Sequence, residues 1–277
     1  MLDALQFGFM RNALFAGLLV SLACGIIGTL VVANRLVFLA GGIAHSAYGG
    51  VGLALYFGFS PFFGAMGFSL AMALLLSAIT VKGRNRADTA VGVLWAVGMA
   101  LGVILVDLSP GYRADLMSLL FGSILTVSYR ELWLMGGTTV LVAGVVALKY
   151  RDLLVLSYDP EFAATRGLDV VGLHTLLLLL VAAGTVVAIH AVGLILVIAL
   201  FTIPPTLAER SCRSLASMMA VSAAWSALFT FLGLDLSYRF NLTSGATIIL
   251  VAAFAFFLFS IRDAKGRGGI RNTPPQS

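Results

Sequence analysis

Long apolar runs recur along the whole of this sequence, each about 17 to 25 residues in length and separated from the next by a polar break. A run of this length crosses a bilayer as an α-helix, whereas a membrane β-barrel would need alternating segments of about ten residues. Of the 277 residues, 60% are hydrophobic and 10% are charged, against about 25% charged residues in soluble domains. The pattern therefore predicts an all-α polytopic membrane protein.

About nine transmembrane helices are expected, and eight remain possible. The expected spans are residues 12–33, 36–57, 61–81, 89–107, 131–148, 173–189, 191–207, 215–232 and 244–261. The least certain pair lies around His190, where the apolar stretch 173–207 is too long for one helix and short for two.

Lysine and arginine are divided unequally between the two sides of this topology. Thirteen of the 17 fall in loops on one side, and four (Arg11, Arg113, Arg130 and Arg239) fall on the other. Because cytoplasmic loops carry the excess of basic residues, we expect the N-terminus outside and the C-terminus inside the cytoplasmic membrane. Residues 1–261 form one transmembrane domain with a long cytoplasmic loop at 149–172, and the basic tail 262–277 is expected to be disordered in the cytoplasm.

The segment 36–56, LVFLAGGIAHSAYGGVGLALY, carries His45 near the middle of an expected span. An imidazole at mid-membrane depth is costly unless it faces protein or water, so His45 is a candidate for a transport route. Glycines in the same segment, among them Gly41 and Gly49, would let neighbouring helices approach closely. A structural histidine, bonded to a carbonyl of the next helix, is the open alternative.

The loop 149–172 contains a short helix signal. Asp159 and Pro160 have the character of an N-cap and a first helical residue, Glu161 adds a favourable charge in the first turn, and Gly167 is a typical C-terminal stop. We therefore expect a helix at 160–166 outside the membrane. Such a helix could dock on a motor subunit or serve as a plain connecting turn.

Two further stretches carry unusual residues for a membrane span. Pro204 and Pro205 should end or kink a helix, because proline lacks the amide hydrogen and clashes with the preceding turn, and broken helices often line or gate a transport route. His190 is either a second ligand or a polar cap on a helix end. Asp235 is expected in an outer loop close to lipid depth, where an unpaired carboxylate would be unusual.

Several function classes are disfavoured by the sequence. No G-x-x-x-x-G-K-[ST] motif occurs, so this chain itself should not hydrolyse ATP. The basic residues are scattered through short loops rather than gathered in a stripe, which argues against nucleic-acid binding. Cys24 and Cys212 share no motif spacing and indicate neither a disulfide framework nor a metal knuckle. The expected outer loops carry slightly more acidic than basic residues. This charge balance would favour cations at the outer mouth, or the charges are ordinary solvated loop residues.

Six segments, taken in order, resemble the membrane permease subunit of ABC importers for zinc, manganese and iron. The matching segments are residues 34–54, 86–105, 115–128, 152–168, 191–208 and 237–250. Six blocks in the right order over nearly the whole chain argue against a chance match.

The resemblance implies a transport subunit, not an enzyme, in an ATP-driven importer that moves a divalent metal ion by alternating access. It implies two cytoplasmic ATPase subunits, an extracytoplasmic metal-binding protein and a second permease subunit, most simply a homodimer. No cofactor of this chain is implied, since ATP would bind the partner subunit. In the family the helix at 160–166 is the coupling helix, whose pattern is kept by Asp159, Pro160, Glu161, Ala163 and Gly167.

The family's metal site draws on a D-x-x-x-H motif in the second span and on an acid before the last span. His45 matches the histidine, Gly41 stands where the aspartate would be, and Asp235 is the nearest match to the later acid. The missing oxygen ligand favours zinc over manganese, because zinc accepts nitrogen readily, and it also leaves room for an altered substrate or a route without a tight site.

Two other functions remain open at this point. An importer of the same architecture could carry a metal chelate such as a siderophore or cobalamin, although the small residues of the second span favour a narrow path. A self-contained transporter or an intramembrane metalloenzyme would need an H-E-x-x-H pair or several carboxylates at mid-membrane depth, and the sequence offers only His45 and His190.

Overall fold

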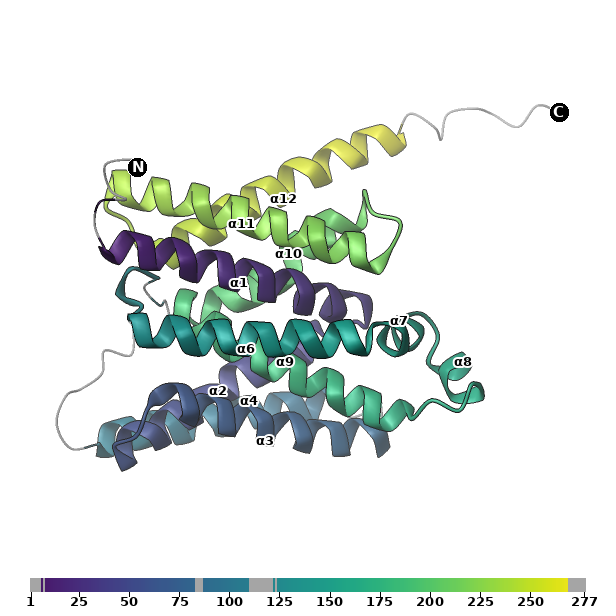
Figure 1. The fold of residues 1–277 in the computed structure, drawn as a ribbon, viewed down its shortest axis with the longest axis horizontal. Coiled ribbons are helices and arrows are strands. Elements are labelled where there is room, and N and C mark those ends of the chain that lie inside the picture. The colour runs from purple at the N-terminus through teal and green to yellow at the C-terminus, as the bar shows by residue number, and fades with distance from the viewer. Residues whose placement is uncertain (1–5, 7, 83–86, 110–121, 123, 269–277) are drawn as a thin grey trace.

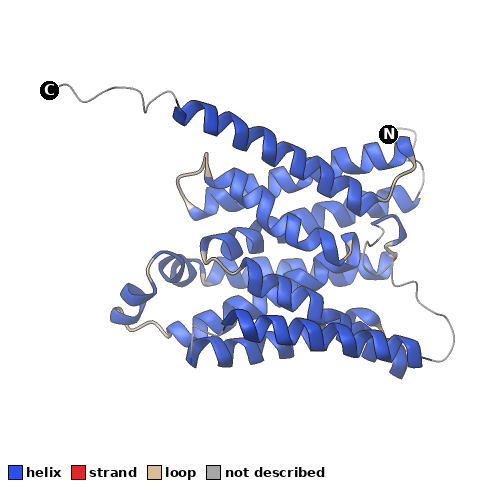
Figure 2. Cartoon of the chain, turned by 180° about the vertical axis from the view of Figure 1, so that it is seen from behind, coloured by secondary structure: helices blue, strands red, loops and turns tan. Residues whose placement is uncertain are grey.

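Helices that pass back and forth along a common direction make up the computed structural model, which describes residues 6, 8–82, 87–109, 122 and 124–268 (Figure 1). No strand occurs among these residues, as the view from behind also shows (Figure 2). Eight helices in this part of the chain are long and apolar enough to cross a membrane, which confirms the predicted all-α membrane fold. They are α1 (Gly8–Ala33), α2 (Val37–Phe57), α3 (Pro61–Lys82), α4 (Ala87–Leu108), α6 (Tyr129–Leu148), α9 (Val170–Val192), α11 (Leu215–Phe240) and α12 (Ser244–Gly268).

The ninth expected span is the shorter helix α10 (Leu194–Glu209), which has 16 residues. Gly193 separates α9 from α10 and has a φ of 78°, in the region that glycine adopts without steric cost. The uncertain stretch around His190 is thus two helices, and His190 lies in the last turn of the first.

Most of α1, α2 and α9 is buried inside the bundle, whereas α4, α6 and α12 are mostly exposed. The exposed side chains of these outer helices are large and apolar, for example Val97 on α4, Leu141 on α6 and Phe254 on α12. Such a surface suits lipid, because hydrocarbon chains impose no cost on exposed apolar groups. The beginning of α1 and the end of α12 lie at opposite ends of the bundle (Figure 1).

Three expected boundaries differ from the structure. The loop 149–172 contains a second helix, α7 (Tyr150–Tyr158), which forms because Leu153 and Leu156 are buried against the bundle. Helix α11 continues to Phe240 rather than 232, so Asp235 is helical and not in an outer loop. Helix α12 continues to Gly268, seven residues beyond the expected end of the transmembrane domain, and the rest of the tail lies outside the described residues.

Glycines allow α2 and α4 to pack backbone against backbone. A Cβ atom added to Gly98 of α4 would lie 2.6 Å from the Cα of Ser46, and one added to Gly102 would lie 2.6 Å from the carbonyl oxygen of Tyr48. Real Cβ atoms do not approach other atoms this closely, so the two helices can touch only where a side chain is absent.

Candidate metal route and coupling helix

The ring of His45 in α2 is stacked on the indole ring of Trp95 in α4. The ring centroids are 3.9 Å apart and the planes differ by 11°. The indole Nε1 of Trp95 donates a hydrogen bond to the sulfur of Met99, at 3.2 Å, which fixes the indole in turn. Stacking on Trp95 therefore orients the imidazole.

The Nδ1 atom of His45 is buried and has no hydrogen-bond partner in the described part of the chain. Among the described residues, no carbonyl accepts a hydrogen bond from Nδ1, although such a bond would be expected for a purely structural histidine. A buried polar atom without a partner calls for an explanation, and a neutral imidazole nitrogen is a common metal ligand. The geometry thus leaves this ring able to contact a passing ion.

Gly41 and Gly49 share the face of α2 that carries His45, since the three residues follow one another at four-residue spacing. A Cβ atom at Gly41 would meet only the side chain of Ile198 in α10, at 3.4 Å. A Cβ atom at Gly49 would lie 2.9 Å from the carbonyl oxygen of Gly98 in α4. The face around His45 therefore lies between α10 and α4, and it tolerates bulk at Gly41 better than at Gly49.

His190 is held by its own helix and by α3. Its Nδ1 lies 3.1 Å from the carbonyl oxygen of Val186, one turn earlier in α9. Its ring meets the ring of Phe62 edge-on, with centroids 5.0 Å apart. A histidine that binds a metal through one ring nitrogen commonly bonds a backbone carbonyl through the other, so these contacts are compatible with both the polar-cap and the ligand interpretation of His190.

Asp235 forms an ion pair with Arg239, one turn later in α11, with Oδ2 and Nε 2.8 Å apart. The carboxylate that seemed unpaired in the sequence thus has a partner within its own helix. The aspartate side chain is 22% exposed and the arginine side chain 65%, so the pair lies at the edge of the bundle.

The structure does not bring His45, His190 and Asp235 into one cluster. They lie on α2, α9 and α11, and each has different neighbours. Among the described residues, no group of three or more His, Cys, Asp or Glu side chains could hold a metal ion. A single copy of the chain therefore shows no cluster of metal ligands in the part that is described.

The short helix expected at 160–166 is present as α8 (Pro160–Thr165), at one end of the bundle (Figure 1). The carboxylate of Asp159 accepts a hydrogen bond from the amide of Phe162, at 2.9 Å, as an N-cap does. Gly167 has a φ of 77° just after the helix, where it ends the turn. Ala163 is fully buried and Glu161 is exposed, so α8 turns one side to the bundle and one side outward.

Helix α7 connects α8 to two transmembrane helices. The side-chain nitrogen of Asn34, just after α1, donates to the hydroxyl of Ser157 near the end of α7, at 2.8 Å. The hydroxyl of Tyr150 at the start of α7 accepts a hydrogen bond from the amide of Ala216 in the first turn of α11, at 3.0 Å. A displacement of α8 would therefore be passed through α7 to α1 and α11.

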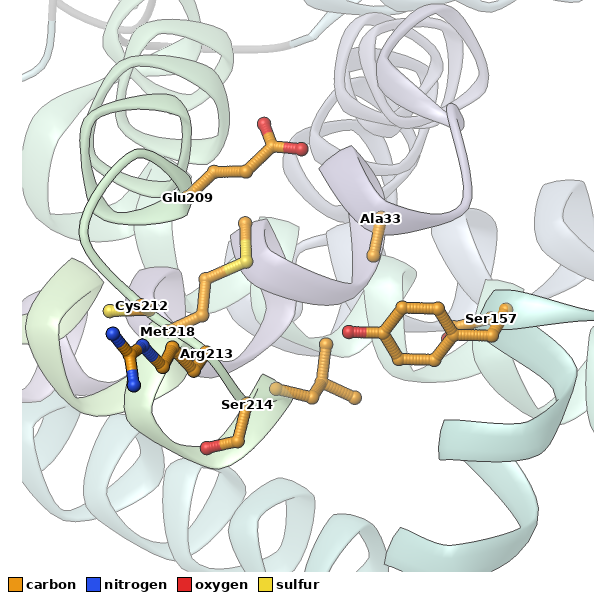
Figure 3. A pocket seen from close by; sticks show the side chains of 9 residues that line it. Ala33, Ser157, Glu209, Cys212, Arg213, Ser214 and Met218 are labelled. Carbon is orange, nitrogen blue, oxygen red and sulfur yellow. The ribbon is translucent and has the colours of Figure 1, made fainter.

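A cavity of about 230 Å³ lies at this junction (Figure 3). Its walls come from the end of α1 at Ala33, the end of α7 at Ser157, and the connection from α10 to α11, including Glu209 and Arg213. The cavity lies next to the residues that lead into α8.

Pro204 and Pro205 lie inside α10, and the helix continues to Glu209 beyond them. The helix does not end at the two prolines, and the other expected outcome, a kink, stays a prediction. They remove two amide donors from the helix ladder, so the carbonyls of Leu200 and Phe201 lose their usual partners. A Cβ atom at Gly28 of α1 would lie 2.9 Å from Pro205, so α1 passes close to α10 at this point.

Sequence reasoning missed Trp95, Asn34 and Tyr150. Trp95 lies within one of the segments that resemble the permease family, but its pairing with His45 joins two different helices and has no sequence spacing. The hydrogen bonds of Asn34 and Tyr150 link residues 123 and 66 positions apart in the chain, and they depend on where α7 packs.

Comparison with known proteins identifies the family. The model of the ABC 3 transport family matches residues 6–263. The chain belongs to the ABC 3 transport family. The resemblance to the permeases of metal-ion ABC importers is therefore confirmed at the level of the family.

Relatives of this ABC 3 family chain match it over nearly its whole length. An uncharacterized membrane protein of Synechocystis is 51% identical over 93% of this chain and 92% of its own length. The manganese transport system membrane protein MntC of Listeria innocua is 35% identical over 92% of this chain and 90% of its own. The solved structure of PsaBC from Streptococcus pneumoniae in complex with Fab has a TM-score of 0.84 and 32% identity, and it covers 94% of this chain and 93% of that one.

Proposed function

We propose that this chain is the permease subunit of an ATP-driven importer of a divalent transition-metal ion, with manganese as the first candidate. The observation that carries the proposal is the family match over residues 6–263, which spans all the described transmembrane helices. Relatives 31–35% identical from Listeria and Streptococcus are manganese transport or import permeases. These relatives favour manganese, whereas Gly41 in place of a carboxylate favours zinc, so both ions enter the test.

We further propose that the ion passes His45 and is contacted there only transiently. A route that bound the ion as tightly as a structural zinc site, by about 10 kcal/mol or more, would not release it. A weak contact is supported by the unpartnered Nδ1 of His45 and by the lack, among the described residues, of any group of three or more His, Cys, Asp or Glu side chains that could hold a metal. His190 and Asp235, which have partners of their own, are secondary candidates on the same route.

The proposed partners follow from the same family. The exposed side of α8, with Glu161, would dock on a cytoplasmic ATPase subunit that binds and hydrolyses ATP. The end of the bundle that carries α8 and the end of α12 would then be cytoplasmic, with the N-terminus outside. An extracytoplasmic metal-binding protein would deliver the ion at the opposite end, and a second copy of the chain would complete the route.

Reconstitution tests the proposal directly. The chain is co-expressed with its ATPase subunit, purified and placed in proteoliposomes, and ATP-dependent uptake of manganese, zinc and iron is measured. We expect uptake of a free divalent ion, manganese before zinc, and none without ATP. Accumulation of a metal chelate but not of the free ions, or transport without any ATPase, would contradict the proposal.

Docking through α8 has its own test. The charge reversal Glu161→Lys should reduce recovery of the ATPase with the permease, because it changes the exposed side of α8. Asp88→Lys is the matched control, since Asp88 is also exposed and lies at the same end of the bundle, in the first turn of α4. Equal recovery of the ATPase with both variants and the parent chain would remove the docking role of α8.

A further inference from the structure

An apolar groove of about 520 Å³ lies between α3, α6 and α9, on a face of the bundle away from the α2–α4 contact. The groove has one hydroxyl in its lining, that of Thr138, and this hydroxyl donates to the carbonyl oxygen of Leu134 at 2.8 Å. The remaining lining is almost entirely hydrocarbon and aromatic. An ion or a polar metabolite would find no partner there, so the chemistry of the groove selects an apolar occupant.

Side chains from the described part of the protein do not fill the groove. Phe63, Trp133 and Leu141 are 54%, 71% and 61% exposed, and nothing lies within 4 Å of a Cβ atom added to Gly137. In a membrane this space faces lipid, and close packing against hydrocarbon recovers the dispersion contacts that an empty groove would lose.

The groove follows most of the length of α6. It follows α6 from Trp133 to Val145, which is about 18 Å at a helical rise of about 1.5 Å per residue. On α3 it begins at Phe62, the second residue of that helix, at the end of the bundle opposite α8 (Figure 1). Along α6 the groove continues to Val145, three residues before the end of that helix, whereas on α3 it ends at Leu70, in the first half of the helix.

The mouth of the groove carries residues suited to a phospholipid headgroup. Tyr129 and Trp133 are both exposed there and meet edge-on, with ring centroids 6.3 Å apart, and such aromatic residues favour the membrane–water interface. Arg130 is exposed and precedes Leu134 by four residues and Gly137 by seven, which places it on the groove face of α6. A guanidinium in this position can bind a phosphate by two parallel hydrogen bonds.

We propose that an acyl chain of a phospholipid, from the leaflet at the end opposite α8, occupies this groove with its phosphate at Arg130. A phospholipid fits better than a transmembrane helix of a second copy, because the exposed Arg130 at the mouth of the groove can pair with a phosphate. The lipid fills the gap between α3 and α6 and so holds these two outer helices at a fixed distance from α9.

Native mass spectrometry of the purified permease–ATPase complex in detergent, titrated with palmitoyl-oleoyl phosphatidylglycerol, tests the proposal. Gly137→Leu should weaken binding of the tightest lipid about tenfold, the change expected when about two buried methylene groups lose their contacts. Gly92→Leu is the matched control, because a Cβ atom at Gly92 also has open space but Gly92 is on α4, outside the groove. Equal lipid binding by both variants and the parent chain would overturn the proposal.

The headgroup contact is tested separately, with a variant that leaves the groove intact. Arg130→Gln should weaken binding of phosphatidylglycerol about fivefold, since one basic residue at the membrane surface contributes about that much. Arg11→Gln, also exposed and near the same end of the bundle, should leave binding unchanged. If Gly137→Leu instead separates two permease copies and leaves lipid binding unchanged, the occupant is the second copy and the lipid proposal is wrong.

Discussion

His45 of α2 and Trp95 of α4 lie ring on ring, 3.9 Å apart between centroids and 11° from parallel. The Nδ1 atom of His45 has no hydrogen-bond partner in the described part of the chain. The stacking connects this ring to α4, a helix that is mostly exposed. The orientation of the proposed ion contact therefore depends on an aromatic residue of a neighbouring helix.

Replacing Trp95 should disturb transport without disturbing assembly. Trp95→Leu removes the stacking, which is worth about 0.5–1.5 kcal/mol, and uptake should fall about two- to tenfold. Trp95→Phe keeps an aromatic face and should restore most of the uptake. Trp225→Phe on α11, which alters a stacked tryptophan remote from His45, is the control. Normal uptake in Trp95→Leu would show that stacking does not position His45.

The α2–α4 contact predicts opposite effects for two glycines of one helix. Gly98→Ala places a Cβ atom 2.6 Å from the backbone of Ser46 and should destabilise the protein by about 1–3 kcal/mol. Gly92→Ala meets open space and should leave stability unchanged or raise it by about 0.5–1 kcal/mol, because alanine favours the helix. Thermal unfolding in detergent measures both. The same midpoint for the two variants would mean that α2 and α4 are not in backbone contact.

Tyr150→Phe should weaken the coupling between α8 and the bundle. The substitution keeps the ring and removes the hydroxyl that accepts the amide of Ala216, a hydrogen bond worth about 0.5–1.5 kcal/mol. We expect less metal transported per ATP hydrolysed, with the ATPase still bound. Tyr158→Phe is the control, since Tyr158 is 73% exposed at the other end of α7. An unchanged ratio of transport to hydrolysis in Tyr150→Phe would exclude this connection from the coupling path.

The ion pair of Asp235 with Arg239 makes it possible to distinguish a structural role of Asp235 from a role as a metal ligand. If Asp235 serves only its partner, Asp235→Asn and Arg239→Gln should each change uptake by no more than about twofold, as expected for an exposed pair one turn apart. A much larger loss for Asp235→Asn than for Arg239→Gln would instead place the carboxylate on the ion route. The two variants are compared in the same uptake assay.

The sequence was sufficient for those features that depend on local chemistry. Apolar runs gave the spans to within a few residues over most of the chain, and Asp159, Pro160 and Gly167 marked α8, because caps and stops act within one turn. The limits of α11 were missed, since Asp235 and Tyr238 read as a polar loop when the partner Arg239 is not considered. α7 was missed because its helix depends on the burial of Leu153 and Leu156 by distant segments.

The candidate site could be predicted only in part for the same reason. His45 stood out in the sequence because a histidine at mid-membrane depth is unusual. Its stacking on Trp95 depends on which helices become neighbours, and no spacing within one segment encodes that. His190 and Asp235 have partners one turn away in their own helices, and these pairs follow only once α9 and α11 are known to extend over both positions.

ATP-dependent manganese uptake by the reconstituted complex, compared between the parent chain and His45→Ala, tests the central claim most directly. We predict that His45→Ala assembles with its ATPase and keeps ATP hydrolysis, while uptake falls by about tenfold or more, equivalent to about 1.4 kcal/mol or more of lost ion contact. Unchanged manganese uptake in an assembled His45→Ala complex would contradict the claim that the ion passes this residue.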